Sequence, residues 1–237
     1  IPLSGGENSP GIDQVNVTGN HLGSYLFAIG TRQKNWEGRI YYEHPFDDHS
    51  GMIFRNKADG LWGIEYRSKV PHAVVSGIVV EFLETRDQSG PFLWDKTQQI
   101  PIQVSAGDWY YGHVVYNGWV HRGHTIGNPL IISPGYNTDG YLGFKSSRVE
   151  ALHIGIDGHI TPEFDYRFLA SLQRGWGTPY FPYIKIEKEF SGMLEVNYAP
   201  RQLQGWKFGL SMAVDAGTLV DNNWAIQLGI CKSGRIL

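Results

Sequence analysis

The last third of the chain alternates large apolar residues with small or polar ones. The alternation covers four segments of about nine residues each, which are 164–173, 190–198, 206–215 and 224–230. A period of two places successive side chains on opposite faces of a β-strand. The pattern therefore predicts four antiparallel strands with one large apolar face and one small, polar or charged face.

Shorter alternating segments precede this region. They lie at 25–30, 62–67, 74–82 and 148–156. Together the segments predict roughly nine or ten strands in a single domain, residues 1–237. Three Gly-, Pro- and Asp-rich stretches separate them, at 43–59, 87–106 and 118–140. They exceed ordinary loop lengths, which indicates functional loops or a plug.

Two architectures fit this alternation. In a soluble sandwich the apolar face turns into a core, whereas in a membrane barrel it turns to lipid. The opposite face is rich in Gly, Ala and Ser, which favours the barrel, as do aromatic residues at strand ends. These aromatics are Phe164, Phe190, Tyr198, Trp206 and Trp224. The predicted fold class is all-β, an antiparallel transmembrane β-barrel.

The connections between the expected strands alternate in length, as in outer-membrane barrels. A tight turn is expected at Asp157–Gly158–His159, and a long loop at 174–189. If the last strand ends in the periplasm, the 217–222, 174–189 and 118–140 connections all lie outside the cell.

The composition argues against several classes of function. Charged residues are only 18% of the 237 residues and the net charge is -3, so nothing points to nucleic acid as a partner. The single cysteine, Cys231, excludes an intrachain disulfide or a multi-cysteine zinc site. No apolar run reaches the ~18–20 residues of a membrane helix, but a barrel strand needs only ~9–11. The start at Ile1 shows no leader pattern and suggests the later part of a longer chain.

Motifs of the common enzyme classes are missing, so we expect neither catalysis nor a cofactor. His44, Asp47, Asp48 and His49 resemble metal ligands but are more typical of a solvated turn. Glu81 and Glu84, or Glu150 and Asp165, are candidate glycosidase pairs. In a barrel such residues pair across the lumen wall instead. The expected ladder comprises Glu65, Arg67, Glu81, Arg148, Glu150, Arg167 and Glu195.

The densest cluster of aromatic and histidine residues spans 108–129. Aromatic rings there could stack on sugars, and His, Arg and Asn side chains could bind hydroxyls or carboxylates. Packing within a girdle or loop explains the same residues equally well. The candidate polysaccharide-binding residues are Trp109, Tyr111, Tyr116, Trp119, His121, Arg122, His124 and Asn128, with Arg174 and Trp176 from the expected 174–189 loop.

Seven motifs in this order resemble the capsule assembly Wzi family, particularly its members in the Bacteroidetes. They are YYEHPFDDHSGMIF (41–54), DGLWGIE (59–65), VVEFLETRDQSGP (79–91), GHTIGNPL (123–130), SRVEALHIGIDG (147–158), RGWGTP (174–179) and GWKFGLSMAVDAGTL (205–219). The resemblance implies a lectin-like outer-membrane β-barrel of about 18 strands, of which this chain would be the C-terminal half. It also implies a cell outer membrane location, with capsular polysaccharide and outer-membrane lipid as partners. The ending ICKSGRIL lacks the terminal aromatic residue common in such barrels.

Two other functions stay open at this point. One is an outer-membrane porin or channel, with Arg and Glu of the lumen setting its selectivity. The other is a soluble β-sandwich that acts on or binds carbohydrate.

Overall fold

The computed structural model describes residues 23–46, 49–54, 56, 58–88, 109–112, 118–179 and 181–234. These residues form an antiparallel all-β structure, as the alternation predicts. Its only helical turns within the described chain are α1 (His49–Met52) and a 3-10 turn at Pro134–Tyr136.

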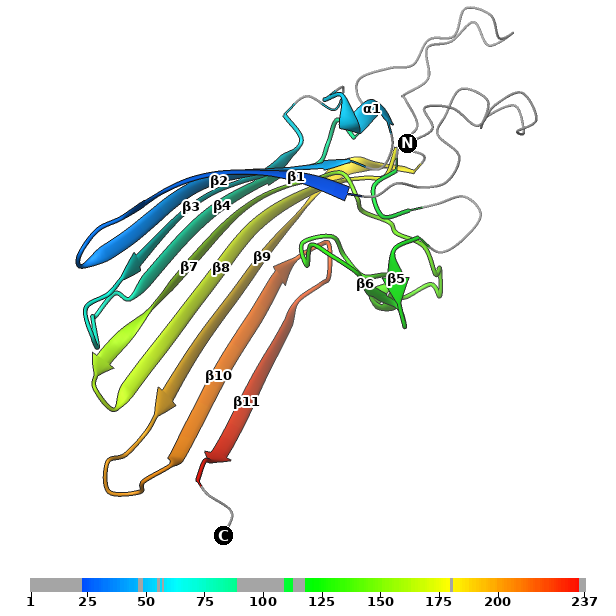
Figure 1. Ribbon diagram of the computed structural model, residues 1–237. Coiled ribbons are helices and arrows are strands. Elements are labelled where there is room, and N and C mark those ends of the chain that lie inside the picture. Colours follow the sequence, from blue (N-terminus) through cyan, green and yellow to red (C-terminus); the bar gives the residue numbers. More distant parts are fainter. Residues whose placement is uncertain are drawn as a thin grey trace, which may run out of the picture.

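Nine strands build one curved sheet (Figure 1). They are β1 (Gly23–Arg32), β2 (Trp36–Phe46), β3 (Gly60–Ser68), β4 (Gly77–Glu84), β7 (Val149–Thr161), β8 (Phe164–Gly177), β9 (Pro182–Tyr198), β10 (Trp206–Gly217) and β11 (Asn223–Lys232). Each strand pairs with the next in this sequence. Within the described chain β1 and β11 do not pair with each other, so the sheet is open. A separate hairpin joins β5 (Val120–His121) to β6 (His124–Thr125).

The strand register gathers the large apolar side chains on one face. One row across β1, β2, β3 and β4 runs through Ile29, Ile40, Ile64 and Val80, and it continues to Ile154 of β7. We call this the apolar face. Two segments cover it locally: Gly51 and Phe54 lie over His44 at one end, and Val74 lies over Gly158 and Tyr166 at the other. Elsewhere even large side chains are exposed, with Ile29, Trp224 and Leu228 at 84%, 78% and 79%.

The opposite, polar face carries small and charged residues together with some apolar ones. The row through Arg39 and Glu65 continues through Val79, Gly155, Leu169, Met193, Ala213 and Ala225. In a neighbouring row, Glu37 of β2 pairs with Arg67 of β3. This division of faces follows from the period of two in the sequence.

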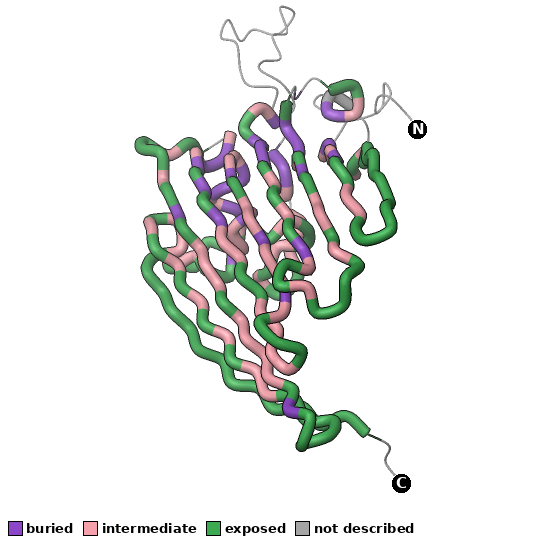
Figure 2. Tube along the Cα trace, turned by 90° about the vertical axis from the view of Figure 1, so that its left-hand side faces the viewer, coloured by how far each residue is buried: buried purple, intermediate pink, exposed green. Residues whose placement is uncertain are grey.

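Two long connections, from β2 to β3 and from β4 to β7, leave one end of the sheet, here the loop end, together with the short connections 178–181 and 218–222. The connection from β4 to β7 is here the long connection. The other end, here the short-turn end, holds connections of two to eight residues, at 33–35, 69–76, 162–163 and 199–205. Most buried residues are also at the loop end (Figure 2). There Trp109, Ile131 and Phe144 of the long connection pack against Leu83 and Val149, which project from the polar face. The long connection therefore covers part of that face.

Two predicted connections are wrong. The strands β7 and β8 continue through Asp157–Gly158–His159 and turn at residues 162–163. Gly158 instead allows the 69–76 connection to approach, since an added Cβ would lie 1.9 Å from the carbonyl oxygen of Val74. The predicted loop at 174–189 is also mostly strand, and only 178–181 separates β8 from β9. The expected strand at 74–82 begins only at Gly77.

A close approach on the polar face depends on Gly63. The Tyr41 ring lies across this glycine, and an added Cβ would meet the ring at 2.0 Å. The Tyr41 hydroxyl donates a hydrogen bond to Glu81 beyond it.

We predict that Gly63→Ala displaces Tyr41 and breaks this hydrogen bond, which lowers the free energy of unfolding by about 1–3 kcal/mol. Urea unfolding in detergent micelles measures the loss. Gly229→Ala is the matched control, because nothing lies within 4 Å of a Cβ at that strand position. Equal stability of the two variants would refute the packing role of Gly63.

Candidate functional site

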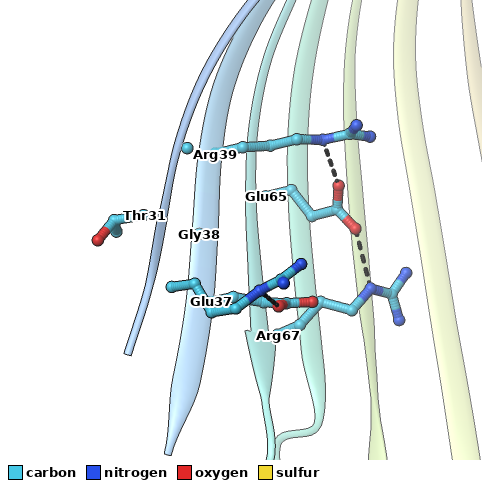
Figure 3. Close-up of a pocket in the computed structure, with 8 residues that line it drawn as sticks. Thr31, Glu37, Gly38, Arg39, Glu65 and Arg67 are labelled. Carbon is cyan, nitrogen blue, oxygen red and sulfur yellow. Dashed lines mark hydrogen bonds and ion pairs between the residues drawn. The ribbon is translucent and has the colours of Figure 1, made fainter. Parts of the chain in front are cut away.

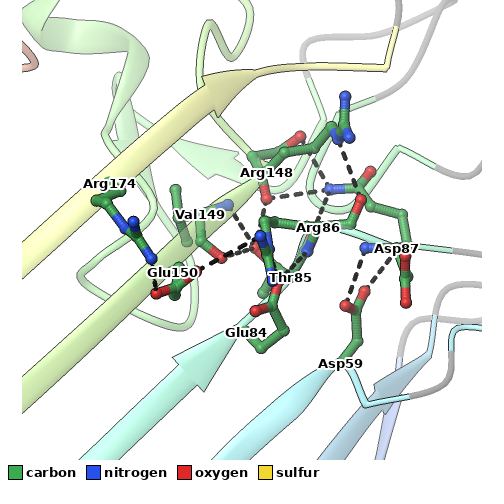
Figure 4. Close-up of polar contacts among 11 residues, drawn as sticks. Asp59, Glu84, Thr85, Arg86, Asp87, Arg148, Val149, Glu150 and Arg174 are labelled. Atoms are coloured by element: carbon green, nitrogen blue, oxygen red, sulfur yellow. Dashed lines mark hydrogen bonds and ion pairs between the residues drawn. The ribbon is translucent and has the colours of Figure 1, made fainter. Parts of the chain in front are cut away.

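A buried carboxylate attaches the long connection to the sheet. Asp59 directly precedes β3 and is fully buried. Its two carboxylate oxygens accept hydrogen bonds from the backbone N–H groups of Asp87 (3.0 Å) and Gln88 (2.5 Å), just after β4 (Figure 4). Because both amides need an acceptor once they are buried, Asp59 fixes the course of the chain after β4.

Gln88 forms further hydrogen bonds with residues near both ends of the long connection. Its side-chain amide donates to the carbonyl oxygens of Thr85 and Ser147, at 3.2 and 3.0 Å. Its side-chain oxygen accepts from the backbone N–H of Tyr110 at 3.2 Å. The Tyr110 hydroxyl returns a bond to the Gln88 carbonyl at 2.9 Å, and Asn56 donates to that hydroxyl. The network joins three connected segments and stabilises the long connection against the sheet.

The surroundings of Asp59 favour the protonated form of its carboxyl. Burial raises the pKa of Asp59 to about 7, although the bonds from Asp87, Gln88 and Tyr110 act in the opposite direction. The carboxyl therefore titrates near neutral pH instead of near its ordinary value.

A groove opens between the long connection and the polar face. It is lined by Glu43 and Leu83 from the strands and by Tyr111, Asn128 and Ile131 from the connection. The Tyr111 hydroxyl accepts a hydrogen bond from the backbone N–H of Asn128 at 3.3 Å. Burial raises the pKa of Tyr111, and the Glu43 carboxylate raises it further. The groove thus offers an acidic wall opposite an aromatic and amide wall.

The β5–β6 hairpin presents a cationic tip beside this groove. Arg122 and Gly123 form its turn with φ values of 49° and 82°, as a two-residue type I′ turn requires. His121 and His124 are paired across the hairpin, and both are exposed, as is Arg122. The ring of Tyr136 meets His124 edge-on, with centroids 6.3 Å apart. Exposed imidazole, guanidinium and phenol groups therefore share one small surface.

The predicted sugar-binding residues are distributed over three surroundings. The hairpin tip holds His121, Arg122 and His124, and Tyr111 and Asn128 line the groove. Trp109 lies in the hydrophobic cluster with 7% exposed, and Trp119 is half-buried. Tyr116 falls outside the described residues.

The last two predicted residues, Arg174 and Trp176, belong to the other side of the sheet. They follow Leu172 on β8 at intervals of two, so they share its apolar face. The structure therefore does not bring them together with the hairpin and the groove.

Ion pairs run across the polar face toward the short-turn end. Glu65 accepts from Arg39 (2.8 Å) and Arg67 (2.9 Å) around a shallow pocket on β1, β2 and β3 (Figure 3). Farther along, Arg167 pairs with Glu195 at 2.7 Å. These pairs join four of the seven residues of the expected ladder. Glu81 lies on the same face but accepts a hydrogen bond from Tyr41. Glu150 lies on the apolar face beyond its last apolar row, where it pairs with Arg174, and Arg148 donates to the Arg86 carbonyl.

The candidate metal ligands and the candidate glycosidase pair Glu81 and Glu84 lie elsewhere. His44 is fully buried, with hydrogen-bond partners at both ring nitrogens: Tyr42 Oη at 2.9 Å and the Gly51 carbonyl at 2.9 Å. Asp47 and Asp48 lie outside the described residues. Glu81 and Glu84 project from opposite faces of β4, so they do not face each other across a shared site.

Several contributors to the site escape sequence reasoning. Asp59, Gln88 and Glu43 lie in stretches without clear periodicity. Only the Asp59–Gly60 step before a strand signals a special position.

Comparison with known protein families, with curated proteins and with solved structures finds no match to this chain. Among the residues that the structure describes, no helix is long and apolar enough to cross a membrane.

The raised pKa of Asp59 predicts a pH dependence. The native state retains a proton that the unfolded chain, with its ordinary pKa of 3.8, releases earlier. The contribution of Asp59 to stability is therefore fully present below about pH 4 and is lost as the pH rises through 7. From pH 5 to pH 8 we expect wild type to lose on the order of 1–3 kcal/mol more unfolding free energy than Asp59→Asn. Urea unfolding at both pH values measures the difference, and parallel losses would contradict this role of Asp59.

Proposed function

We propose that this protein is a lectin-like β-barrel of the cell outer membrane. In this proposal it binds capsular or extracellular polysaccharide and supports capsule assembly at the cell surface. The apolar face contacts lipid, and the polar face lines the lumen. The exposed apolar face, opposite a polar face partly covered by a long connection, is the observation that carries the proposal.

The height of the apolar face supports a membrane location. On β8 the apolar residues run from Phe164 to Leu172, and charged Arg174 follows. Eight steps of about 3.3 Å span about 26 Å along the strand. At a tilt of about 40° the band is about 20 Å tall, close to the roughly 25 Å apolar band of outer-membrane barrels.

Aromatic rings at both borders of the band give further support. Toward the short turns, Phe164 stacks on Tyr198 with ring centroids 4.3 Å apart. Toward the loop end, Tyr42 stacks on Trp62 at 4.0 Å. Amphipathic rings collect where hydrocarbon meets water, so two such borders are expected of a membrane-spanning sheet.

The long connections at one end support polysaccharide binding at the cell surface. The hairpin tip combines His121, Arg122 and His124, which can donate hydrogen bonds to sugar hydroxyls or carboxylates. Exposed Tyr136 adds an aromatic surface. Weak contacts of this kind gain strength when one polymer carries many repeats.

A channel is the second candidate, favoured by the small and charged residues of the polar face. Single-channel conductance in a planar bilayer distinguishes the two. A lectin-like barrel whose long connection fills the lumen conducts little, whereas a porin conducts steadily.

Adjacent residues on β9 test the membrane orientation. Leu194 lies on the apolar face and Met193 on the polar face. We expect Leu194→Arg to cost about 2–4 kcal/mol of membrane assembly, and Met193→Arg to cost much less. The readout is the membrane fraction that migrates differently in unboiled and boiled gel samples. Equal recovery of both variants, or a wild-type protein without any heat-dependent shift, would refute the barrel.

Substitutions at the hairpin tip test polysaccharide binding. His121→Ala with Arg122→Ala removes exposed groups without touching the hydrophobic cluster, so retention of polymer on the cell surface should fall several-fold. Polymer staining of intact cells measures it. Arg32→Ala, an exposed cation near the short-turn end, is the matched control. Undiminished retention in the hairpin variant would remove the tip from the binding site.

A further inference from the structure

A cationic cluster borders the apolar face at its loop end. Glu84, Glu150, Arg174 and Lys188 form one row across β4, β7, β8 and β9. Arg86 and Arg148 lie just beyond this row (Figure 4). So does Trp176, whose backbone N–H donates to the Arg148 carbonyl. We call these seven residues the rim cluster. It begins directly after the last apolar row, since Arg174 follows Leu172, and Lys188 precedes Phe190.

The carboxylates of the rim cluster lie beneath its cations. The side chains of Glu84 and Glu150 are only 10% and 17% exposed, whereas those of Arg86 and Arg174 are 43% and 49% exposed. The rim cluster contains four cationic residues and two carboxylates, and the carboxylates pair with Arg86 and Arg174. The surface that a ligand meets is therefore positive.

The guanidinium groups are held in place before any ligand arrives. Arg86 Nε lies 2.5 Å from a Glu84 oxygen, and Arg174 donates a hydrogen bond to Glu150. Trp176 lies between the two arginines, whose Cζ atoms are 4.9 and 5.6 Å from its ring. Fixed guanidinium groups lose less conformational entropy when they bind a phosphate.

The adjoining groove suits the apolar part of the same ligand. It is lined by Leu152, Leu172 and Phe190 from the apolar face and by Glu150, Arg174 and Lys188 from the rim cluster. Lys185, Glu187 and Glu189 of β9 also line it. An apolar floor that ends in a cationic border matches an amphiphile with an acyl chain and an anionic headgroup.

We propose that the rim cluster binds the phosphate groups of a phosphorylated glycolipid in the surrounding membrane leaflet. Guanidinium groups match phosphate oxygens in geometry and charge, and the groove receives an acyl chain. The inference rests on the proposed membrane location. It assigns Arg174 and Trp176 to lipid instead of polysaccharide.

The test uses the full chain extracted in a nonionic detergent. A bis-phosphorylated glycolipid is added, and lipid retained per protein is measured by native mass spectrometry. We expect Arg86→Gln with Arg174→Gln to retain at least tenfold less lipid than wild type. Arg39→Gln with Arg67→Gln is the matched control, because these arginines also share a carboxylate but lie on the polar face. The control should retain the wild-type amount.

Two further additions identify the ligand. The dephosphorylated glycolipid should not be retained, and millimolar inorganic phosphate should not displace the intact lipid. Retention of both lipids alike, unchanged retention in the rim variant, or an equal loss in the control would each overturn the inference. If the rim variant does not fold, Lys188→Gln replaces it, with a two- to threefold loss expected and no loss overturning the inference.

Gel mobility of the same samples separates this inference from the proposed function. A preserved heat-dependent shift without specific lipid retention overturns the rim site alone. Absence of the shift in wild type overturns the membrane barrel as well.

Discussion

The structure depends on one constraint: a nine-stranded sheet with an exposed apolar face. Backbone hydrogen bonds between neighbouring strands satisfy the interior of the sheet. They leave rows of Ile, Leu, Val, Phe and Trp side chains largely exposed. Burying such side chains is worth about 1.5–3 kcal/mol each, so water is an unfavourable surrounding for this face. An apolar medium would remove this free-energy cost. Polar groups would then be needed only at the borders of the apolar face.

The polar groups of the structure follow from that division. Charged residues on the polar face pair with neighbours in adjacent strands, as Arg39 and Arg67 do with Glu65. Buried polar groups gather at the loop end, where Asp59 and Gln88 connect the chain after β4 to the sheet. The long connection then packs its own apolar residues on the polar face. The loop end is thus the best-packed part of the described chain.

The sequence predicts the sheet well because alternation reports side-chain direction directly. All four segments of the last third are strands, and their apolar positions share one face. Prediction fails where a strand leaves the apolar band. In the first part of β9, Ile184 and Ile186 alternate with Lys185 and Glu187, but Lys188 then places a charge on the apolar face and interrupts the pattern. In β2 the apolar row is interrupted by Gly38, and this strand is missed entirely.

The site is less predictable because residue spacing does not reveal which face a charged residue joins unless the strand is known. Glu150 and Leu152 are two residues apart, so parity alone assigns Glu150 to the apolar face once β7 is recognised. The burial of Trp109 depends on long-range packing against Val149 and Leu83, which no local pattern encodes. The exposed hairpin is different, because Arg122–Gly123 between two short polar segments is a local turn signal.

The edges of the sheet impose a last condition on any membrane location. Within the described chain, β1 and β11 each have one side without a strand partner. In hydrocarbon each unpaired backbone group costs several kcal/mol, so only closed sheets span a membrane. The apolar side chains of β11 remain exposed up to this edge, with Trp224, Leu228 and Ile230 each more than 70% exposed. A membrane-embedded form therefore requires further strands against both edges. Strands that continue the apolar face on both sides would complete the barrel around the long connection.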